Sequence, residues 1–188
     1  MSSSSIAKSV GTVCLVSLSG YCTVLTGGKL LKTGNLRARL ESMGYLTSLD
    51  IKKNQFLKWK RVFLRNRDEV SKIINLQGNS SDNMGAYMLK RWCYQSLNAE
   101  YTQGKDITEI KKYCLMSNRD KILEEDNVEF VSHEELFPNY REFLKTEGIT
   151  NVEDLNIWCS TALDRNFSWK NTQEFKNIRD LCTSVHSN

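Results

Sequence analysis

The feature that most constrains the fold of this chain is an internal repeat centred on a Trp-Cys pair. Trp92-Cys93 recurs as Trp158-Cys159, whereas about 0.1 such pairs would be expected by chance from four Trp and six Cys in 188 residues. The similarity continues downstream, where Leu97, Tyr101, Ile110 and Cys114 correspond in order to Leu163, Phe167, Ile178 and Cys182. The sequence therefore predicts a small body with two degenerate copies of one unit.

Each copy has the pattern of helices. Around Trp92-Cys93 the apolar residues recur at i, i+1, i+4, i+5 and i+9, which places them on one face of a helix. Thr150 with Glu153 predicts a capping box at the start of the equivalent helix, and Asp106 and Asn171 open the helices that follow. A single proline and ten glycines argue against an all-β protein with many tight turns. The predicted fold class is mostly α.

A stretch without charge precedes this body. No charged side chain occurs from Ser9 to Gly28, and a helix of about 20 residues spans the roughly 30 Å of membrane hydrocarbon. Serine and threonine hydroxyls can bond to carbonyl groups one turn back, so a helix tolerates them in lipid. We expect an N-terminal single transmembrane helix that anchors the chain. A cleaved signal peptide and a buried helix of a soluble protein are alternatives.

Positive charge is concentrated directly after this stretch, in a segment that we term the basic collar (residues 29–67). It holds eleven Lys and Arg residues against only Glu41 and Asp50, a formal balance of +9. Because the whole chain carries +4 and Lys8 contributes one charge, residues 68–188 carry −6. The candidate contacts with anionic lipid or another polyanion are Lys29, Lys32, Arg37, Arg39, Lys52, Lys53, Lys58, Lys60 and Arg61.

The basic collar has three interpretations, which differ in the partner that its positive charges contact. Anionic lipid head groups attract cations near a membrane, by about 1 kcal/mol for each cation. The collar could instead be a solvated helix face without any partner. We do not expect nucleic acid as the main partner, because no recognised nucleic-acid-binding motif accompanies the charges.

Four of the six cysteines occupy equivalent positions in the two copies. Cys93 with Cys114, and Cys159 with Cys182, would close loops of similar length. If the body faces an oxidising exterior, we expect both pairs as disulfides. The alternative is four reduced cysteines that pack as small apolar side chains. Trp59, which lies among charged residues, is expected to be partly exposed.

No motif of a known chemistry is complete in this chain. The run His133-Glu134-Glu135-Leu136 starts like a zinc-protease motif, but Phe137 stands where the second histidine is required. The other histidine is His186 and no Cys-x-x-Cys occurs, so we expect no metal site. The run Gly27-Gly28-Lys29 lacks the earlier glycine of a phosphate-binding loop. We therefore expect no enzyme, no cofactor and no small-molecule substrate.

The uncharged span Ser9–Gly28, the lysine-rich helical body and the two Trp-Cys pairs, with Cys114 and Cys182 some twenty residues later, form a recognisable combination. It resembles the large paralogous families of uncharacterised proteins in haemotropic mycoplasmas. The resemblance covers nearly the whole chain. It implies a membrane-anchored protein of wall-less bacteria that is surface-exposed and antigenically variable, and it supplies no catalytic residue.

These observations predict three segments and a function. Residues 1–28 form an N-terminal anchor or signal-like segment, residues 29–117 the basic membrane-proximal helices and the first repeat, and residues 118–188 the second repeat. We expect a single-pass cell-membrane protein with its body outside, although the positive-inside rule applied to the collar favours the cytoplasm. The predicted function is that of a helical interaction or surface-antigen protein whose partners are the bilayer and a host or other protein ligand. The alternative is a scaffold at the cytoplasmic face that binds anionic lipid or nucleic acid through Lys29–Arg67.

Overall fold

The structure is a computed structural model that describes residues 14–16, 22–26, 29–76, 78, 80–102, 104–125, 128–134 and 140–185. For residues 14–16, 22–26, 29–33 and 185 it describes the backbone alone. The described part is mostly helical, as the sequence predicts. The helices are α1 (Leu36–Ser42), the 3-10 helix η1 (Ser48–Asp50), α2 (Gln55–Arg65), α3 (Arg67–Ile73), α4 (Asp82–Asn98), α5 (Thr108–Cys114), α6 (Asn118–Ile122), α7 (Arg141–Thr146), α8 (Val152–Asp164) and α9 (Thr172–Cys182). The strands are β1 (Cys14–Val16), β2 (Cys22–Thr26), β3 (Lys29–Thr33), β4 (Val128–Phe130) and β5 (Thr183–Val185).

The N-terminal stretch differs from the predicted transmembrane helix. The described parts of Ser9–Gly28 are β1 and β2, which form an antiparallel sheet with β3 in the order β1-β2-β3. The helical prediction is therefore wrong for these residues, and the rest of Ser9–Gly28 lies outside the described residues. The composition of β2 explains the difference, because Thr23, Val24 and Thr26 are β-branched and favour extended backbone. No helix in the described part is long and apolar enough to cross a membrane.

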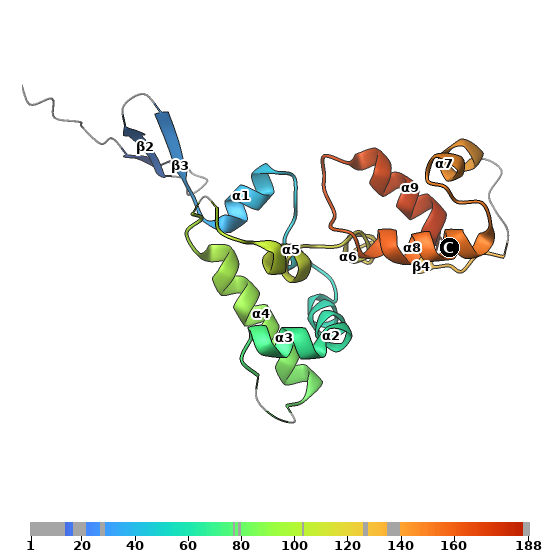
Figure 1. Ribbon diagram of the computed structural model, residues 1–188, viewed down its shortest axis with the longest axis horizontal. Helices are drawn as coiled ribbons and strands as arrows, with labels where there is room; N and C mark the ends of the chain where they lie inside the picture. Colours follow the sequence, from blue (N-terminus) through green and yellow to red (C-terminus); the bar gives the residue numbers. More distant parts are fainter. Residues whose placement is uncertain are drawn as a thin grey trace, which may run out of the picture.

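The helices form two groups, α1–α5 and α6–α9, which we term the first and second helical units (Figure 1). Each has its own cluster of buried side chains. In the first unit Trp59 and Phe63 are fully buried, so the predicted partial exposure of Trp59 is wrong. In the second unit Leu155, Ile178 and Leu181 are fully buried. The sheet of β2 and β3 lies beside α1, at the far end from α7 (Figure 1).

Three extended segments lie side by side where the two units meet, and we term them the junction: residues 44–47 after α1, residues 115–118 after α5, and residues 165–169 after α8. Each segment is bridged to the other two by backbone pairing. The amide of Met116 donates to the oxygen of Leu46 at 2.9 Å, and the amide of Phe167 donates to the oxygen of Met116 at 2.8 Å. The middle segment, residues 115–118, therefore forms backbone hydrogen bonds on both sides, as an inner strand of a sheet does.

Each helical unit contains one disulfide. Cys93 on α4 is bonded to Cys114 at the end of α5, with the sulfur atoms 2.04 Å apart. Cys159 on α8 is bonded to Cys182 at the end of α9, with the sulfur atoms 2.13 Å apart. All four cysteines are buried. The predicted pairing is confirmed, and the alternative of four reduced cysteines is not what the structure shows.

Helices α2 and α4 pack closely because α4 has a glycine where they touch. The fully buried ring of Phe63 lies so near Gly85 that a Cβ atom at that position would overlap the ring. Glycine permits this approach because it has no side chain. The contact fixes the distance between the two longest helices of the first unit.

Replacing Gly85 with alanine should lower the free energy of unfolding. In a helix interior this substitution ordinarily stabilises by about 1 kcal/mol, but overpacking of a core costs about 1–3 kcal/mol. Urea denaturation of the G85A protein should therefore show a net loss. The matched control is Asn83→Ala on the exposed side of α4, which should be near neutral. A more stable G85A protein would contradict the close contact with Phe63.

Candidate functional site

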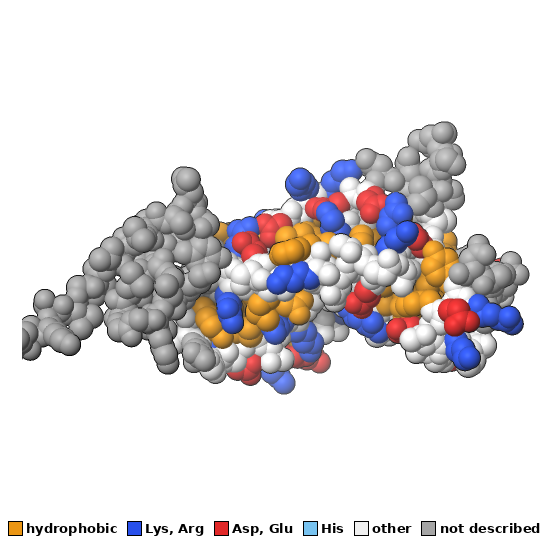
Figure 2. Space-filling model, turned by 90° about the horizontal axis from the view of Figure 1, so that it is seen from above, with side chains coloured by type: hydrophobic (Ala, Val, Ile, Leu, Met, Phe, Trp, Pro, Cys, Tyr) orange, Lys and Arg blue, Asp and Glu red, His pale blue; other side chains and the backbone are white. Residues whose placement is uncertain are grey.

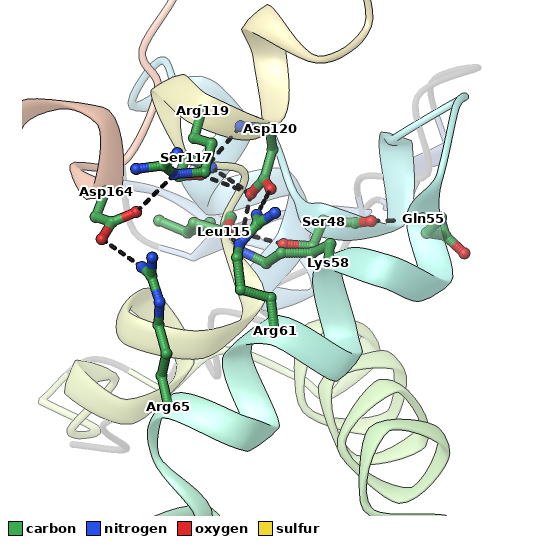
Figure 3. Close-up of polar contacts among 10 residues, drawn as sticks. All are labelled: Ser48, Gln55, Lys58, Arg61, Arg65, Leu115, Ser117, Arg119, Asp120 and Asp164. Carbon is green, nitrogen blue, oxygen red and sulfur yellow. Dashed lines mark hydrogen bonds and ion pairs between the residues drawn. The ribbon is translucent and has the colours of Figure 1, made fainter. Parts of the chain in front are cut away.

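Asp120 lies at the start of α6, where local hydrogen bonds fix its side chain. Ser117 and Asp120 form a capping box: the Ser117 hydroxyl accepts from the Asp120 amide at 3.2 Å, and the Ser117 amide donates to Asp120 Oδ2 at 2.9 Å. The Ser117 hydroxyl also donates to Oδ2 at 2.8 Å. Only 1% of the Asp120 side chain is exposed. Its carboxylate faces α2 across the junction (Figure 3).

Helix α2 supplies two cations to this carboxylate. Lys58 Nζ donates to Asp120 Oδ2 at 2.8 Å and to the backbone oxygen of Leu115 at 3.1 Å, and only 6% of its side chain is exposed. Arg61 contacts Asp120 Oδ1. Residues three apart share a helix face, so Lys58 and Arg61 reach the same carboxylate. Both oxygens of Asp120 are thereby matched to positive charge.

The Lys58–Asp120 pair titrates differently from the same groups in water. Burial lowers the pKa of the Lys58 ammonium, and the charge of Asp120 offsets only part of that effect. Burial alone would raise the pKa of the Asp120 carboxyl, but the charges of Lys58 and Arg61 and the bonds from Lys58 and Ser117 outweigh it. The pKa of Asp120 is therefore below its ordinary value of 3.8. Near neutral pH Asp120 is charged.

A second carboxylate joins α2 to the second helical unit. Asp164, the last residue of α8, accepts from Arg65 Nη1 at 2.5 Å and from Arg119 Nε at 3.2 Å. Figure 3 shows the cations and carboxylates converging from α2, α6 and α8. We term the six residues the junction cluster: Lys58, Arg61, Arg65, Arg119, Asp120 and Asp164. Four cations share two carboxylates, which leaves a formal charge of +2.

A cavity of about 250 Å³ lies beside the junction cluster. Its charged lining is Lys58, Arg61, Arg65, Lys112 and Asp164, and the ring of Tyr113 lines it as well. Lys112 is held at its rim by Glu69, with Nζ 2.7 Å from Oε2. Tyr113 is 1% exposed, burial raises the pKa of its hydroxyl, and the hydroxyl lies beside the Lys112–Glu69 pair.

The structure corrects the role predicted for part of the basic collar. Lys58 was a candidate contact for lipid, but it is buried against Asp120 and cannot reach a membrane surface. Arg61 is directed to the same carboxylate. Arg37 is paired with Glu41 and Asp50 within the first unit. These cations meet carboxylates of the same chain, which none of the three interpretations of the collar foresaw.

The other candidate contacts are placed differently. Arg39, Lys52 and Lys53 are exposed, Lys60 is half-buried, and the side chains of Lys29 and Lys32 lie outside the described residues. On the face shown in Figure 2 basic and acidic side chains alternate and do not separate into one basic patch. Their contact with lipid or another polyanion stays a prediction.

The chemistry of the junction cluster is that of fixed cations and hydrogen-bond donors. Guanidinium groups and ammonium groups bind carboxylates and phosphates, and they do so most strongly where water is excluded. Among the described residues, no group of three or more His, Cys, Asp or Glu side chains is arranged to hold a metal ion. The cavity is therefore suited to an anion.

Sequence reasoning missed the carboxylates at the centre of this site. A local signal for one of them was present, because Ser117 and Asp120 have the same spacing as Thr47 and Asp50, which form a second capping box at η1. That spacing predicts a helix start. It does not reveal that Lys58, 62 residues earlier, binds the same carboxylate.

Asp120→Asn should destabilise the protein by about 3–5 kcal/mol, because it leaves Lys58 buried without a counter-charge. Lys58→Met should cost clearly less, since Asp120 keeps its contacts with Arg61 and Ser117. Urea denaturation of both proteins at pH 7 measures the difference. A larger loss for Lys58→Met than for Asp120→Asn would show that Asp120 is not the shared centre of the cluster.

The low pKa of Asp120 predicts a sensitivity to acid. A carboxyl whose pKa is lower in the folded than in the unfolded state stabilises fully above the unfolded value, and this contribution is lost as the pH falls through the folded value. Unfolding free energies measured in steps below pH 3.8 should therefore fall more steeply for the wild type than for Asp120→Asn. Equal slopes for the two proteins would rule out this linkage, because every other carboxyl is common to both.

A comparison with family models, with curated proteins and with solved structures finds no significant match to this chain. The resemblance to the proteins of haemotropic mycoplasmas therefore stays a prediction.

Proposed function

We propose that this chain is a helical binding protein that acts outside the cytoplasm at the cell membrane. Its N-terminal segment directs it there, and its two helical units are degenerate copies of one duplicated unit. It acts by contacting a protein ligand and not by catalysis.

The two disulfides are the observation that carries this proposal. Disulfides persist in oxidising surroundings and are rare in proteins that remain in a reducing cytoplasm. Each disulfide closes the same kind of helix pair, α4 with α5 and α8 with α9, over 21 and 23 residues. Cross-links of this kind stabilise small domains by about 2–4 kcal/mol each. A body built in this way is suited to conditions outside the cell.

The surface of α4 supports a role in binding. Met84, Tyr87 and Tyr94 are each more than half exposed, at 51%, 58% and 59%. Residues three and seven apart share one face of a helix, so these side chains form a stripe. Tyrosine is enriched at protein–protein contacts because its ring is large and apolar while its hydroxyl is polar. This stripe is the surface on which we propose that a protein ligand docks.

The alternative function, a scaffold at the cytoplasmic face, has less support. It depends on free cations in the collar, and Arg37, Lys58, Arg61 and Arg65 are bound to carboxylates of the same chain. It also offers no reason for two disulfides.

Protease treatment of intact cells that produce the full chain tests the location. The body should be degraded while a cytoplasmic marker protein survives. Alkylation of the purified, denatured protein tests the disulfides. Peptides with Cys93, Cys114, Cys159 and Cys182 should become alkylated only after reduction, because their thiols are bonded in pairs.

A matched control is the Cys159→Ser/Cys182→Ser protein, in which the first pair should still require reduction. Full protection of the body in intact cells, with cleavage after lysis, would contradict the proposed location. Four thiols that react without reductant would contradict the proposed surroundings.

A further inference from the structure

We infer that the cavity beside the junction cluster is a binding site for a dianionic tetrahedral oxyanion, either free phosphate or sulfate or the phosphate group of a small monoester. This site is distinct from the proposed protein-binding face on α4. It uses side chains that the proposed function leaves without a role.

The charges of the junction cluster do not cancel. Arg65 and Arg119 share Asp164, while Lys58 and Arg61 share Asp120. A formal excess of two positive charges therefore stands between the two helical units. Like charges held close together repel, and a dianion placed among them removes the excess.

Several cations lie on the wall of the cavity. Lys58, Arg61, Arg65 and Lys112 all line it, and Asp164 is the one carboxylate among its lining residues, while Asp120 and Glu69 pair with three of these cations from behind the wall. Arginine presents several N–H groups in a planar fork that fits the oxygens of a phosphate or sulfate. The cavity of about 250 Å³ is several times the roughly 30 Å³ that one water molecule occupies in the liquid, so it has room for a tetrahedral oxyanion.

A neighbouring hollow extends the site. Arg65 and Asp164 also line a second depression together with Arg119 and Arg165. A ligand with its phosphate group in the cavity therefore has space for an attached organic group toward α8. This arrangement favours a small monoester over the free ion.

Calorimetric titration of the full chain near pH 7.5, at constant ionic strength, tests the inference with four probes: inorganic phosphate, sulfate, glycerol phosphate and acetate. We expect the three dianions to bind and acetate, a monoanion, to bind at least tenfold more weakly. Tighter binding of glycerol phosphate than of inorganic phosphate would identify a monoester as the ligand. Equal binding would identify the free oxyanion. Acetate that binds as tightly as phosphate would overturn the inference.

Two variants should move the affinity in opposite directions. Arg65→Gln removes a cation from the wall and should weaken phosphate binding about tenfold, the effect of one charge-assisted hydrogen bond. Asp164→Asn removes the opposing carboxylate and should strengthen binding about fivefold. The control Lys176→Gln, which removes an exposed cation from α9, should leave the affinity unchanged. Weaker binding by Asp164→Asn, or no change in either variant, would contradict the site.

Discussion

The contact of one buried carboxylate, Asp120, with two cations of α2 holds the two helical units together. Asp120 begins α6, and Lys58 and Arg61 lie on the side of α2 that faces it. Lys58 also donates to the backbone oxygen of Leu115 in the middle segment of the junction. The Asp120 carboxylate and its partner Lys58 therefore link the start of α6, the helix α2 and the paired extended segments of the junction. Burial of this kind is tolerated only where each charge and each lone pair has a partner.

The uneven distribution of charge along the chain has its main explanation in this contact. The collar balance of +9 and the balance of −6 in residues 68–188 suggested an external partner. In the structure, Lys58, Arg61, Arg65 and Arg67 reach carboxylates that lie after residue 68. Charge asymmetry between two halves of a chain is equally well explained when the halves bind each other.

Local features were predictable from the sequence, and distant contacts were not. The helical pairs and both disulfides follow from apolar periodicity and from the matched positions of Cys93, Cys114, Cys159 and Cys182, which are properties of short stretches. Trp59 shows the limit of such reasoning, because its neighbour Lys58 is itself buried, so charged neighbours in the sequence do not place the ring at the surface. The N-terminal stretch shows a second limit of sequence reasoning. A stretch without charge is compatible with a helix in lipid and with strands, and the β-branched residues of β2 favour strands in its described part. The site itself requires pairs 62 and 99 residues apart, for which a single sequence has no signal.

The order of the junction residues along the chain has a consequence for biosynthesis. A ribosome delivers α2 well before the carboxylates that neutralise it, since Asp120 follows Lys58 by 62 residues and Asp164 follows Arg65 by 99. Until α6 emerges, the ammonium of Lys58 has to stay hydrated, because a lone charge is not stable in an apolar interior. In the nascent first unit, the side of α2 that carries Lys58 therefore stays exposed to water. Translation of α6 and then of α8 supplies the two carboxylates in turn and allows this side of α2 to be buried. The C-terminal half thus completes the packing of the half that was made first.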